Sequence, residues 1–119
     1  ALQQGAIQAL QSFPDWPRQL HATCRERRDC VVETLRARGW SVPCPEMAMY
    51  LWFPLPDAAH RRGWSDEDAA RELLQRSGVA LTPGSGFGGG GRQWLRMALV
   101  RPVNELVEVA ERLADAMDD

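Results

Sequence analysis

Apolar residues recur at helical spacing in two long segments of this chain. Between residues 17 and 38 one face is formed by Leu20, Cys24, Val31 and Leu35, and Gly39 follows as a left-handed stop. From about residue 102 onwards there is a more complete stripe, which consists of Val103, Leu106, Val107, Ala110, Leu113, Ala114 and Met117. The pattern predicts two amphipathic helices. The second ends in an acidic tail, residues 115–119, which we expect to be frayed.

A third helix is predicted from the polar residues at its start. Ser65 and Asp68 have the spacing of a capping box, with aspartate in place of the usual glutamate. The segment that follows has one face made of Ala70, Leu73, Leu74 and Ser77, and Gly78 ends it.

Three segments have the composition of β-strands. Residues 49–53 are rich in strand-forming side chains and are closed by two prolines. Residues 79–82 and 94–100 are similar, and a glycine-rich loop separates them. The order helix, strand, helix, strand, strand, helix predicts an α+β fold, with a small, mainly antiparallel sheet packed against helices. A chain of 119 residues can bury one modest core.

We expect that domain to cover residues 15–119, with residues 1–14 outside it. The first ten residues have a helical composition but no capping residue, as in the remnant of a longer element. Pro14 and Pro17 then interrupt the segment. We expect this remnant to be frayed, or packed in a non-native way, without ordered contacts of Ile7 and Leu10 with the core.

The charged residues exclude several classes of function. All 14 residues of the Lys+Arg total are arginine, so no side chain can form a Schiff base. The formal net charge is −2 and the two signs are mixed, which excludes the continuous positive face of a nucleic-acid-binding protein. The run from Arg25 to Asp29 is interpreted as solvated surface.

The cysteines indicate neither a disulfide framework nor a metal site. There are three, without CxxC spacing, which fits a reducing compartment, and we expect the cytoplasm. His21 and Cys24 could lie side by side on a helix, with Cys30 and Cys44 nearby, but the paired-ligand pattern of a zinc site is missing. Cys24 is interpreted as a core residue. No segment is long and apolar enough to cross a bilayer, so no membrane partner is expected.

The glycine-rich loop contains a formal GxGxxG match over residues 84–89. A dinucleotide-binding loop of this kind opens a helix whose N-terminus holds the pyrophosphate. Here the next predicted element is a strand, so the loop is interpreted as a series of turns. Ser85 is not in a GxSxG motif either, because Pro83 stands at the first glycine position.

Arg96 is the strongest candidate for a functional residue. Alternation along the predicted strand places it on one face with Trp94 and Ala98, and the other face consists of Leu95, Met97 and Leu99. A guanidinium among apolar side chains is costly unless an anion meets it. Spacing alone leaves a functional and a structural interpretation open. In the functional one, Arg96 binds an anionic ligand. In the structural one, it pairs with a carboxylate of its own chain or lies at a strand end.

Three stretches resemble the small carboxy-terminal domain of the class I and II aminotransferases, which have the aspartate-aminotransferase fold. Residues 45–53, PEMAMYLWF, resemble the strand after the family's long interdomain helix. Residues 78–88, GVALTPGSGFG, resemble its glycine-turn segment, and residues 94–100, WLRMALV, resemble the strand that follows. The resemblance covers nearly the whole chain.

This resemblance implies a site and a chemistry. It implies that Arg96 binds the α-carboxylate of the substrate and that Phe87 lies near the substrate entrance. It also implies pyridoxal phosphate as cofactor, amino acids and 2-oxo acids as substrates, and a homodimer. The catalytic lysine and the cofactor-binding residues of the family lie in a preceding large domain, of which residues 1–14 would be the end of a helix. No residue here therefore inherits a catalytic, cofactor-binding or metal-binding role.

Other functions stay open at the level of the sequence. A stand-alone α+β module could bind a small carboxylate through Arg96 without a cofactor. A structural or dimer-forming domain would make Arg96 dispensable. The resemblance also does not choose the amino donor among alanine, aspartate, glutamate and diaminopimelate.

Overall fold

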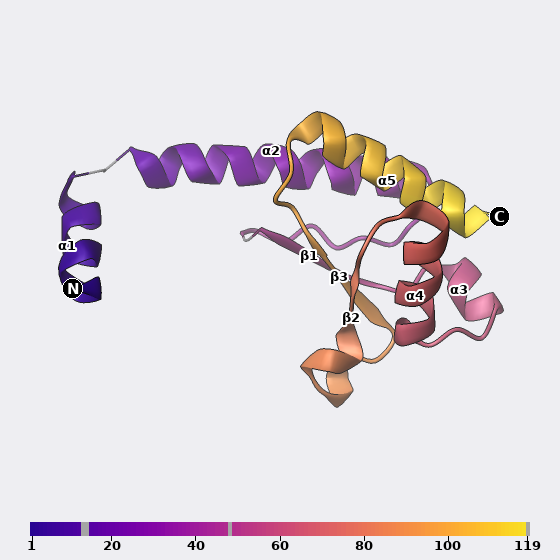
Figure 1. The fold of residues 1–119 in the computed structure, drawn as a ribbon. Helices are drawn as coiled ribbons and strands as arrows, with labels where there is room; N and C mark the ends of the chain where they lie inside the picture. Colours follow the sequence, from indigo (N-terminus) through magenta and orange to yellow (C-terminus); the bar gives the residue numbers. More distant parts are fainter. Residues whose placement is uncertain (13–14, 48, 119) are drawn as a thin grey trace.

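The computed structural model describes residues 1–12, 15–47 and 49–118 of the chain. Three positions used above therefore lie outside the described residues: Pro14, where a break is predicted, Ala48 of the stretch 45–53, and Asp119 of the acidic tail. Figure 1 shows the arrangement of the helices and the sheet. In chain order the elements are α1 (Leu2–Ser12), α2 (Trp16–Ala37), β1 (Tyr50–Pro54), α3 (Asp57–Arg61), α4 (Asp66–Ser77), β2 (Thr82–Pro83), two short 3₁₀ segments (Gly84–Phe87 and Gly89–Gly91), β3 (Trp94–Ala98) and α5 (Val103–Asp118).

The sheet is antiparallel throughout, and its strand order is β1-β3-β2. On the central strand, Arg96 has Trp52 of β1 opposite it on one side and Thr82 of β2 on the other. The predicted α+β class and antiparallel sheet are confirmed. The predicted strand over residues 79–82 is wrong in extent, because the chain runs from the end of α4 to the sheet edge and joins the ladder only at Thr82.

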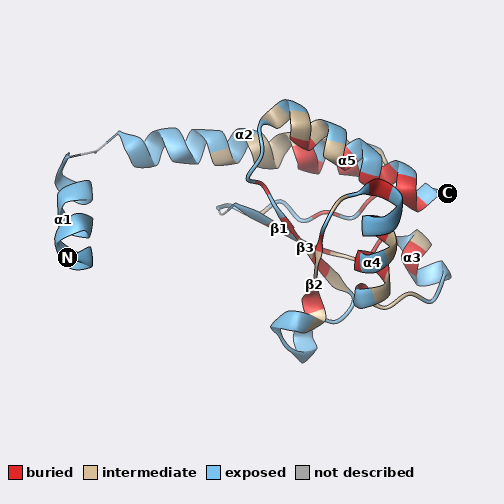
Figure 2. Ribbon diagram, viewed as in Figure 1, coloured by how far each residue is buried: buried red, intermediate tan, exposed pale blue. Residues whose placement is uncertain are grey.

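The core lies between one face of the sheet and the helices. Leu51, Phe53, Leu95 and Met97 are buried on that face. Figure 2 shows the buried residues gathered where α5, the C-terminal half of α2, and α4 meet the strands. These helices leave the opposite face of the sheet, which carries Arg96, more open.

α2 is buried only in its second half. The helix ends where Gly39 takes a positive φ of 83°, as the sequence predicts, and Val31 and Leu35 are fully buried. Leu20, predicted for the same buried face, is 37% exposed, and Cys24 is only half-buried. The reason is that α2 extends beyond α5 and the strands, so its first turns have little to pack against (Figure 1).

α4 begins with the predicted capping box. The Ser65 hydroxyl accepts a hydrogen bond from the Asp68 N–H, and the Asp68 carboxylate accepts one from the Ser65 N–H. The helix ends at Gly78, whose φ is 71°. The prediction for Leu74 is wrong, since this side chain is 48% exposed. At about 100° per residue, Leu74 lies well to one side of the buried stripe of Ala69, Ala70, Leu73 and Ser77.

α5 carries the predicted stripe and continues further than expected. Leu106, Ala110, Leu113 and Met117 are buried, whereas Val103 and Val107 are half-buried. The expectation of a frayed acidic tail is wrong over residues 115–118, which are helical. Arg38, just after α2, donates hydrogen bonds to Glu111, Asp115 and Asp118, at 2.7, 2.6 and 2.9 Å. These bonds tie the tail to the end of α2.

α1 is a regular helix and contains no buried residue. Of the two alternatives predicted for this segment, fraying is wrong, whereas the expected absence of core contacts agrees with the exposure of its side chains. Leu10 is 80% exposed and Ile7 is also exposed, so neither side chain joins the core of residues 15–118. Figure 1 shows α1 standing apart at the far end of α2.

Candidate functional site

The site is built around Arg96 in the middle of the central strand. The predicted alternation is confirmed: Leu95 and Met97 are buried against the helices, and Arg96 and Trp94 are half-buried on the other face. Strand neighbours therefore hold the arginine backbone from both sides.

Two aromatic rings enclose the guanidinium of Arg96. Its Cζ atom lies 4.5 Å from the centroid of the Tyr50 ring and 4.5 Å from that of the Phe87 ring. Both contacts are in the range of cation–π attraction, and ring contacts of this kind restrict where a long side chain can point. The structure thus brings together both residues that the resemblance singled out, Arg96 and Phe87. It adds Tyr50, which sequence reasoning missed.

Two tryptophans extend this aromatic surface. Trp52 makes an edge contact with Phe87 at 5.7 Å and 80°, and it stacks on Trp94 at 6.0 Å and 11°. We call the group formed by Tyr50, Trp52, Phe87 and Trp94 the aromatic face. Three of its members, Tyr50, Trp52 and Phe87, are exposed large apolar side chains. The pairing of β1 with β3 creates this face, so alternation along β1 would have indicated Tyr50 only once that pairing was known.

Arg96 makes no ion pair with any carboxylate within residues 1–12, 15–47 and 49–118. Other arginines of the chain do, as Arg101 does with Glu105 at 2.7 Å. Arg96 also lies in the middle of its strand and not at an end, with β1 on one side and β2 on the other. Because the guanidinium lies against two aromatic rings and has no carboxylate partner among the described residues, its N–H groups are left to meet an anion from outside.

The loop that carries Phe87 is tightly closed at its base. A Cβ atom on Gly84 would overlap the carbonyl oxygen of Gly91, and one on Gly91 would overlap the carbonyl oxygen of Gly84. Only glycine fits at these two positions without moving the backbone. The loop leads into β3 and not into a helix, as predicted, so its N–H groups are not arranged as in a dinucleotide-binding motif.

Asp66, at the start of α4, spans the base of this loop. It is 3% exposed and accepts hydrogen bonds from the N–H groups of Ser85, at 2.8 Å, and Gln93, at 3.3 Å. Burial by itself raises the pKa of the Asp66 carboxyl, but the hydrogen bonds from Ser85 and Gln93 outweigh it and lower the pKa below its usual value. Sequence reasoning missed Asp66, because the capping box accounts for Ser65 and Asp68 and gives no role to the two residues between them.

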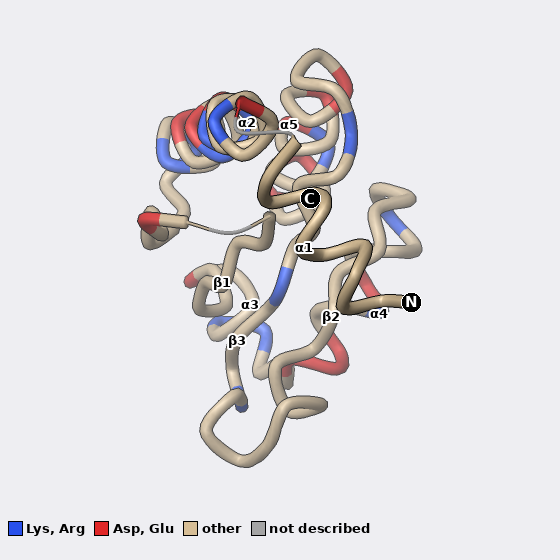
Figure 3. Tube along the Cα trace, turned by 90° about the vertical axis from the view of Figure 1, so that its left-hand side faces the viewer, with Lys and Arg blue, Asp and Glu red and all other residues tan. Residues whose placement is uncertain are grey.

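The balance of charge differs between the two long helices (Figure 3). α2 carries arginines and acidic residues mixed along its length. α5 is predominantly acidic, with Arg112 as its one arginine against Glu105, Glu108, Glu111, Asp115 and Asp118. Among the described residues, no helix combines the length and apolar composition needed to span a membrane.

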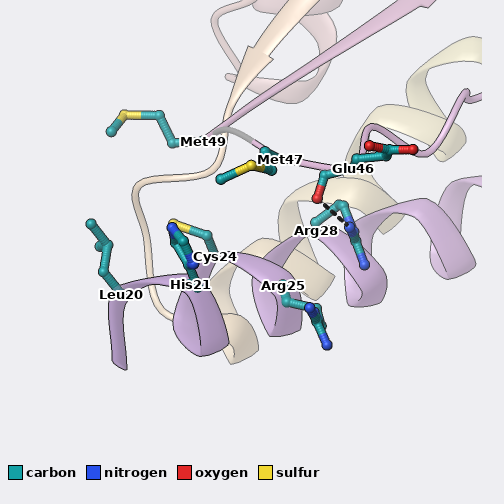
Figure 4. A pocket seen from close by; sticks show the side chains of 8 residues that line it. All are labelled: Leu20, His21, Cys24, Arg25, Arg28, Glu46, Met47 and Met49. Carbon is teal, nitrogen blue, oxygen red and sulfur yellow. Dashed lines mark hydrogen bonds between the residues drawn. The ribbon is translucent and has the colours of Figure 1, made fainter. Parts of the chain in front are cut away.

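A separate pocket of about 360 Å³ lies between α2 and the side chains of Glu46, Met47 and Met49 (Figure 4). It is lined by Leu20, His21, Cys24, Arg25, Arg28, Glu46, Met47 and Met49. Arg28 is fixed there by hydrogen bonds to the carbonyl oxygens of Pro45 and Glu46, so part of the charged run predicted to be solvated has a structural role. Within the described ranges, no three side chains of the metal-binding types are grouped as in a metal site.

Known proteins resemble this chain over almost all of its length. A family model described as "Aminotransferase class I and II" matches residues 1–113. The LL-diaminopimelate aminotransferases of Desulforudis audaxviator and Dehalococcoides mccartyi are 38% and 36% identical, over 94% and 97% of this chain. The chain spans only 27% and 28% of those two relatives.

Solved structures give the same picture of the fold. A probable N-succinyldiaminopimelate aminotransferase from Thermus thermophilus is 42% identical and has a TM-score of 0.68, over 79% of this chain and 24% of that one. An aminotransferase from Staphylococcus aureus is 26% identical and has a TM-score of 0.85, over 98% of this chain and 30% of its own.

Proposed function

Because the chain belongs to the class I and II aminotransferases, we propose that it acts as the carboxy-terminal part of a longer, pyridoxal-phosphate-dependent enzyme and binds the α-carboxylate of the substrate through Arg96. The observation that carries this proposal is the guanidinium of Arg96, which is enclosed by two rings at 4.5 Å and has no carboxylate partner among the described residues. The aromatic face is open to solvent, so an incoming molecule can reach this side chain.

The chemistry of the group suits an amino-acid substrate. A planar guanidinium can donate two parallel hydrogen bonds to one carboxylate, which fixes both the position and the orientation of the bound acid. Tyr50 and Phe87 contact the guanidinium and restrict its side chain, so little side-chain freedom is lost when the acid binds. A substrate held in this way keeps its Cα–H bond in a constant direction, which is a requirement for proton transfer from that carbon.

The cofactor places a limit on what this chain does. Pyridoxal phosphate, when bound, supplies an electron sink for the reacting carbon, and a lysine amine is needed to hold it covalently. Every basic side chain counted in the Lys+Arg total here is arginine, so the residues of this chain do not fit that requirement. We therefore assign substrate binding to the chain and no step of the chemistry.

The names of the relatives suggest where to begin with substrates. Several are LL-diaminopimelate aminotransferases, and one solved structure is named as a probable N-succinyldiaminopimelate aminotransferase. We propose an amino acid and a 2-oxo acid as the substrate pair, with diaminopimelate-type donors to be tested first. For the complete enzyme we also propose a homodimer, as is general for the family.

Replacement of Arg96 by lysine in the complete enzyme tests the proposal. Lysine keeps the charge but cannot form two parallel hydrogen bonds, so kcat/KM for the amino donor should fall about 10- to 100-fold, as expected for one lost charge-assisted bond of roughly 1.5–3 kcal/mol. Cofactor binding, followed by its absorbance, should be nearly unchanged. Arg101→Lys is the matched control, because Arg101 is exposed just after β3 and pairs only with Glu105 among the described residues. Equal kcat/KM for Arg96→Lys and the wild type would refute the proposal.

A further inference from the structure

Two polar side chains are buried in the described part of the chain, those of Asp66 and Ser77. Of these two, only Asp66 is ionisable. It is the first residue of α4, directly after Ser65. The cap of that helix is formed by Ser65 and Asp68, so the cap does not explain why Asp66 is buried. Its carboxylate instead points to the neighbouring glycine loop.

Each oxygen of the Asp66 carboxylate binds a different end of that loop. Oδ2 accepts the N–H of Ser85, near the start, at 2.8 Å, and Oδ1 accepts the N–H of Gln93, at the end, at 3.3 Å. Gln93 has a φ of 67°, the one positive value among the non-glycine residues described. A non-glycine residue in this conformation is held there by its surroundings. The Asp66 carboxylate is one of those constraints.

The loop closed in this way carries Phe87, whose ring centroid lies 4.5 Å from the Cζ atom of Arg96. Phe87 is 54% exposed, and besides its contact with Arg96 its ring makes an edge contact with Trp52. Its position therefore depends on the path of the loop between Ser85 and Gln93.

We propose that Asp66 is a positioning residue for substrate binding: its carboxylate joins the two ends of the glycine loop and so keeps Phe87 against Arg96. Its effect on catalysis rests on the proposed role of Arg96, whereas its effect on the loop does not. Among the described residues Asp66 bonds to the N–H groups of Ser85 and Gln93 and not to Arg96, so its proposed effect on Arg96 is transmitted through the loop.

The test uses Asp66→Asn and Asp66→Ala in the complete enzyme. Asparagine has nearly the same size, but its amide has one oxygen and an NH₂ group that cannot accept from the second backbone N–H. Both variants should raise KM for the amino donor, with kcat/KM lowered roughly 10- to 100-fold and kcat changed much less. A merely structural role would lower the active fraction, so kcat would fall while KM stayed the same.

A second readout does not depend on activity. Phenylglyoxal modifies accessible arginines, and mass spectrometry of peptides can follow the rate at Arg96 and, as an internal standard, at Arg101. Loss of the two hydrogen bonds from Ser85 and Gln93 to Asp66, which we call the loop brace, should move Phe87 away from Arg96. The rate of phenylglyoxal modification at Arg96 should then rise several-fold, with the rate at Arg101 unchanged. Glu67→Gln is the control, since Glu67 is an exposed carboxylate of the same turn and reaches the loop only through the Ser85 hydroxyl at 3.4 Å.

The outcomes separate the two proposals. If Asp66 variants leave both KM and the Arg96 rate at the wild-type values, the positioning role is wrong even when Arg96→Lys is impaired. If the Arg96 rate rises in the Asp66 variants but Arg96→Lys is fully active, the loop brace stands and the carboxylate-binding role of Arg96 fails. If both Asp66 variants lose the folded state, so that all arginines react quickly, the proposal is also overturned, because Asp66 is then a general stability residue.

Discussion

At the scale of single residues, the site depends on contacts between segments that are distant in the sequence. Alternation along one strand was enough to predict the orientation of Arg96, because it needs only local geometry. Tyr50 and Asp66 could not be predicted in this way. Tyr50 reaches Arg96 through the pairing of β1 with β3, and Asp66 reaches Ser85 and Gln93 through the packing of α4 beside the loop.

The buried carboxylate of Asp66 should make the free energy of unfolding decrease as the pH falls into the acidic range. Its pKa in the folded protein is below the usual aspartate value, so its stabilising contribution is complete above about pH 4 and is lost as the pH falls further, through the lowered value. Urea denaturation at about pH 7 and about pH 3 should show that the wild type exceeds Asp66→Asn in unfolding free energy at the higher pH, and that the difference shrinks at the lower pH.

Asp68 also has a lowered pKa, chiefly because of its bonds with Ser65, but it is present in both proteins and its contribution cancels in the comparison. A difference between wild type and variant that is the same at both pH values would contradict the assigned cause.

At the scale of secondary-structure elements, the pattern of the sequence predicted where the long helices form. It did not predict which of their turns are buried, because that depends on where the neighbouring elements end. Periodicity identified α2, α4 and α5, but it could not indicate that α2 extends beyond its packing partners, which leaves Leu20 exposed. It also could not indicate that Arg38 forms ion pairs with carboxylates along the end of α5, which is helical to Asp118. α3, of five residues, is too short for a periodic signal and was not predicted.

The capping box of α4 gives a prediction for this scale. Ser65→Ala removes the acceptor for the Asp68 N–H and should lower the unfolding free energy by about 1 kcal/mol. The measurement is urea denaturation, with the m-value unchanged. Ser41→Ala, at an exposed position in the segment after α2, serves as the control and should match the wild type. An equal loss in both variants would indicate a general cost of removing a hydroxyl and not a cap.

At the scale of the whole molecule, one core organises the chain from α2 to α5. The helices cover one face of the sheet, while α1 has no buried residue and lies away from that core (Figure 2). The sequence was sufficient to predict the fold class, because the order of the elements and their apolar faces allow few ways to bury a core. The division between residues 1–14 and 15–119 is still a prediction.

Deletion of residues 1–12 tests that division. Since none of the residues of α1 is buried, its removal takes away almost no apolar contact, and the Tm of the remaining chain should change by no more than about 2 °C. Thermal unfolding followed by circular dichroism measures this directly. As a contrast, Leu113→Ala in the core of α5 should lower the unfolding free energy by about 2–5 kcal/mol. A similar loss on deleting residues 1–12 would place α1 within the cooperative unit.

The contact between Gly84 and Gly91 also limits how this protein can diverge. Every other amino acid has a Cβ atom, so a single substitution at either position puts an atom where a carbonyl oxygen already lies. By contrast, Gly86, Gly89 and Gly90 face open space, with nothing within 4 Å of the place that a Cβ atom would take. Descendants of this sequence, or libraries made from it, can therefore vary the residues at the tip of the loop and so change the surface beside Arg96. Gly84 and Gly91, where the two ends of the loop come closest, have to stay glycine.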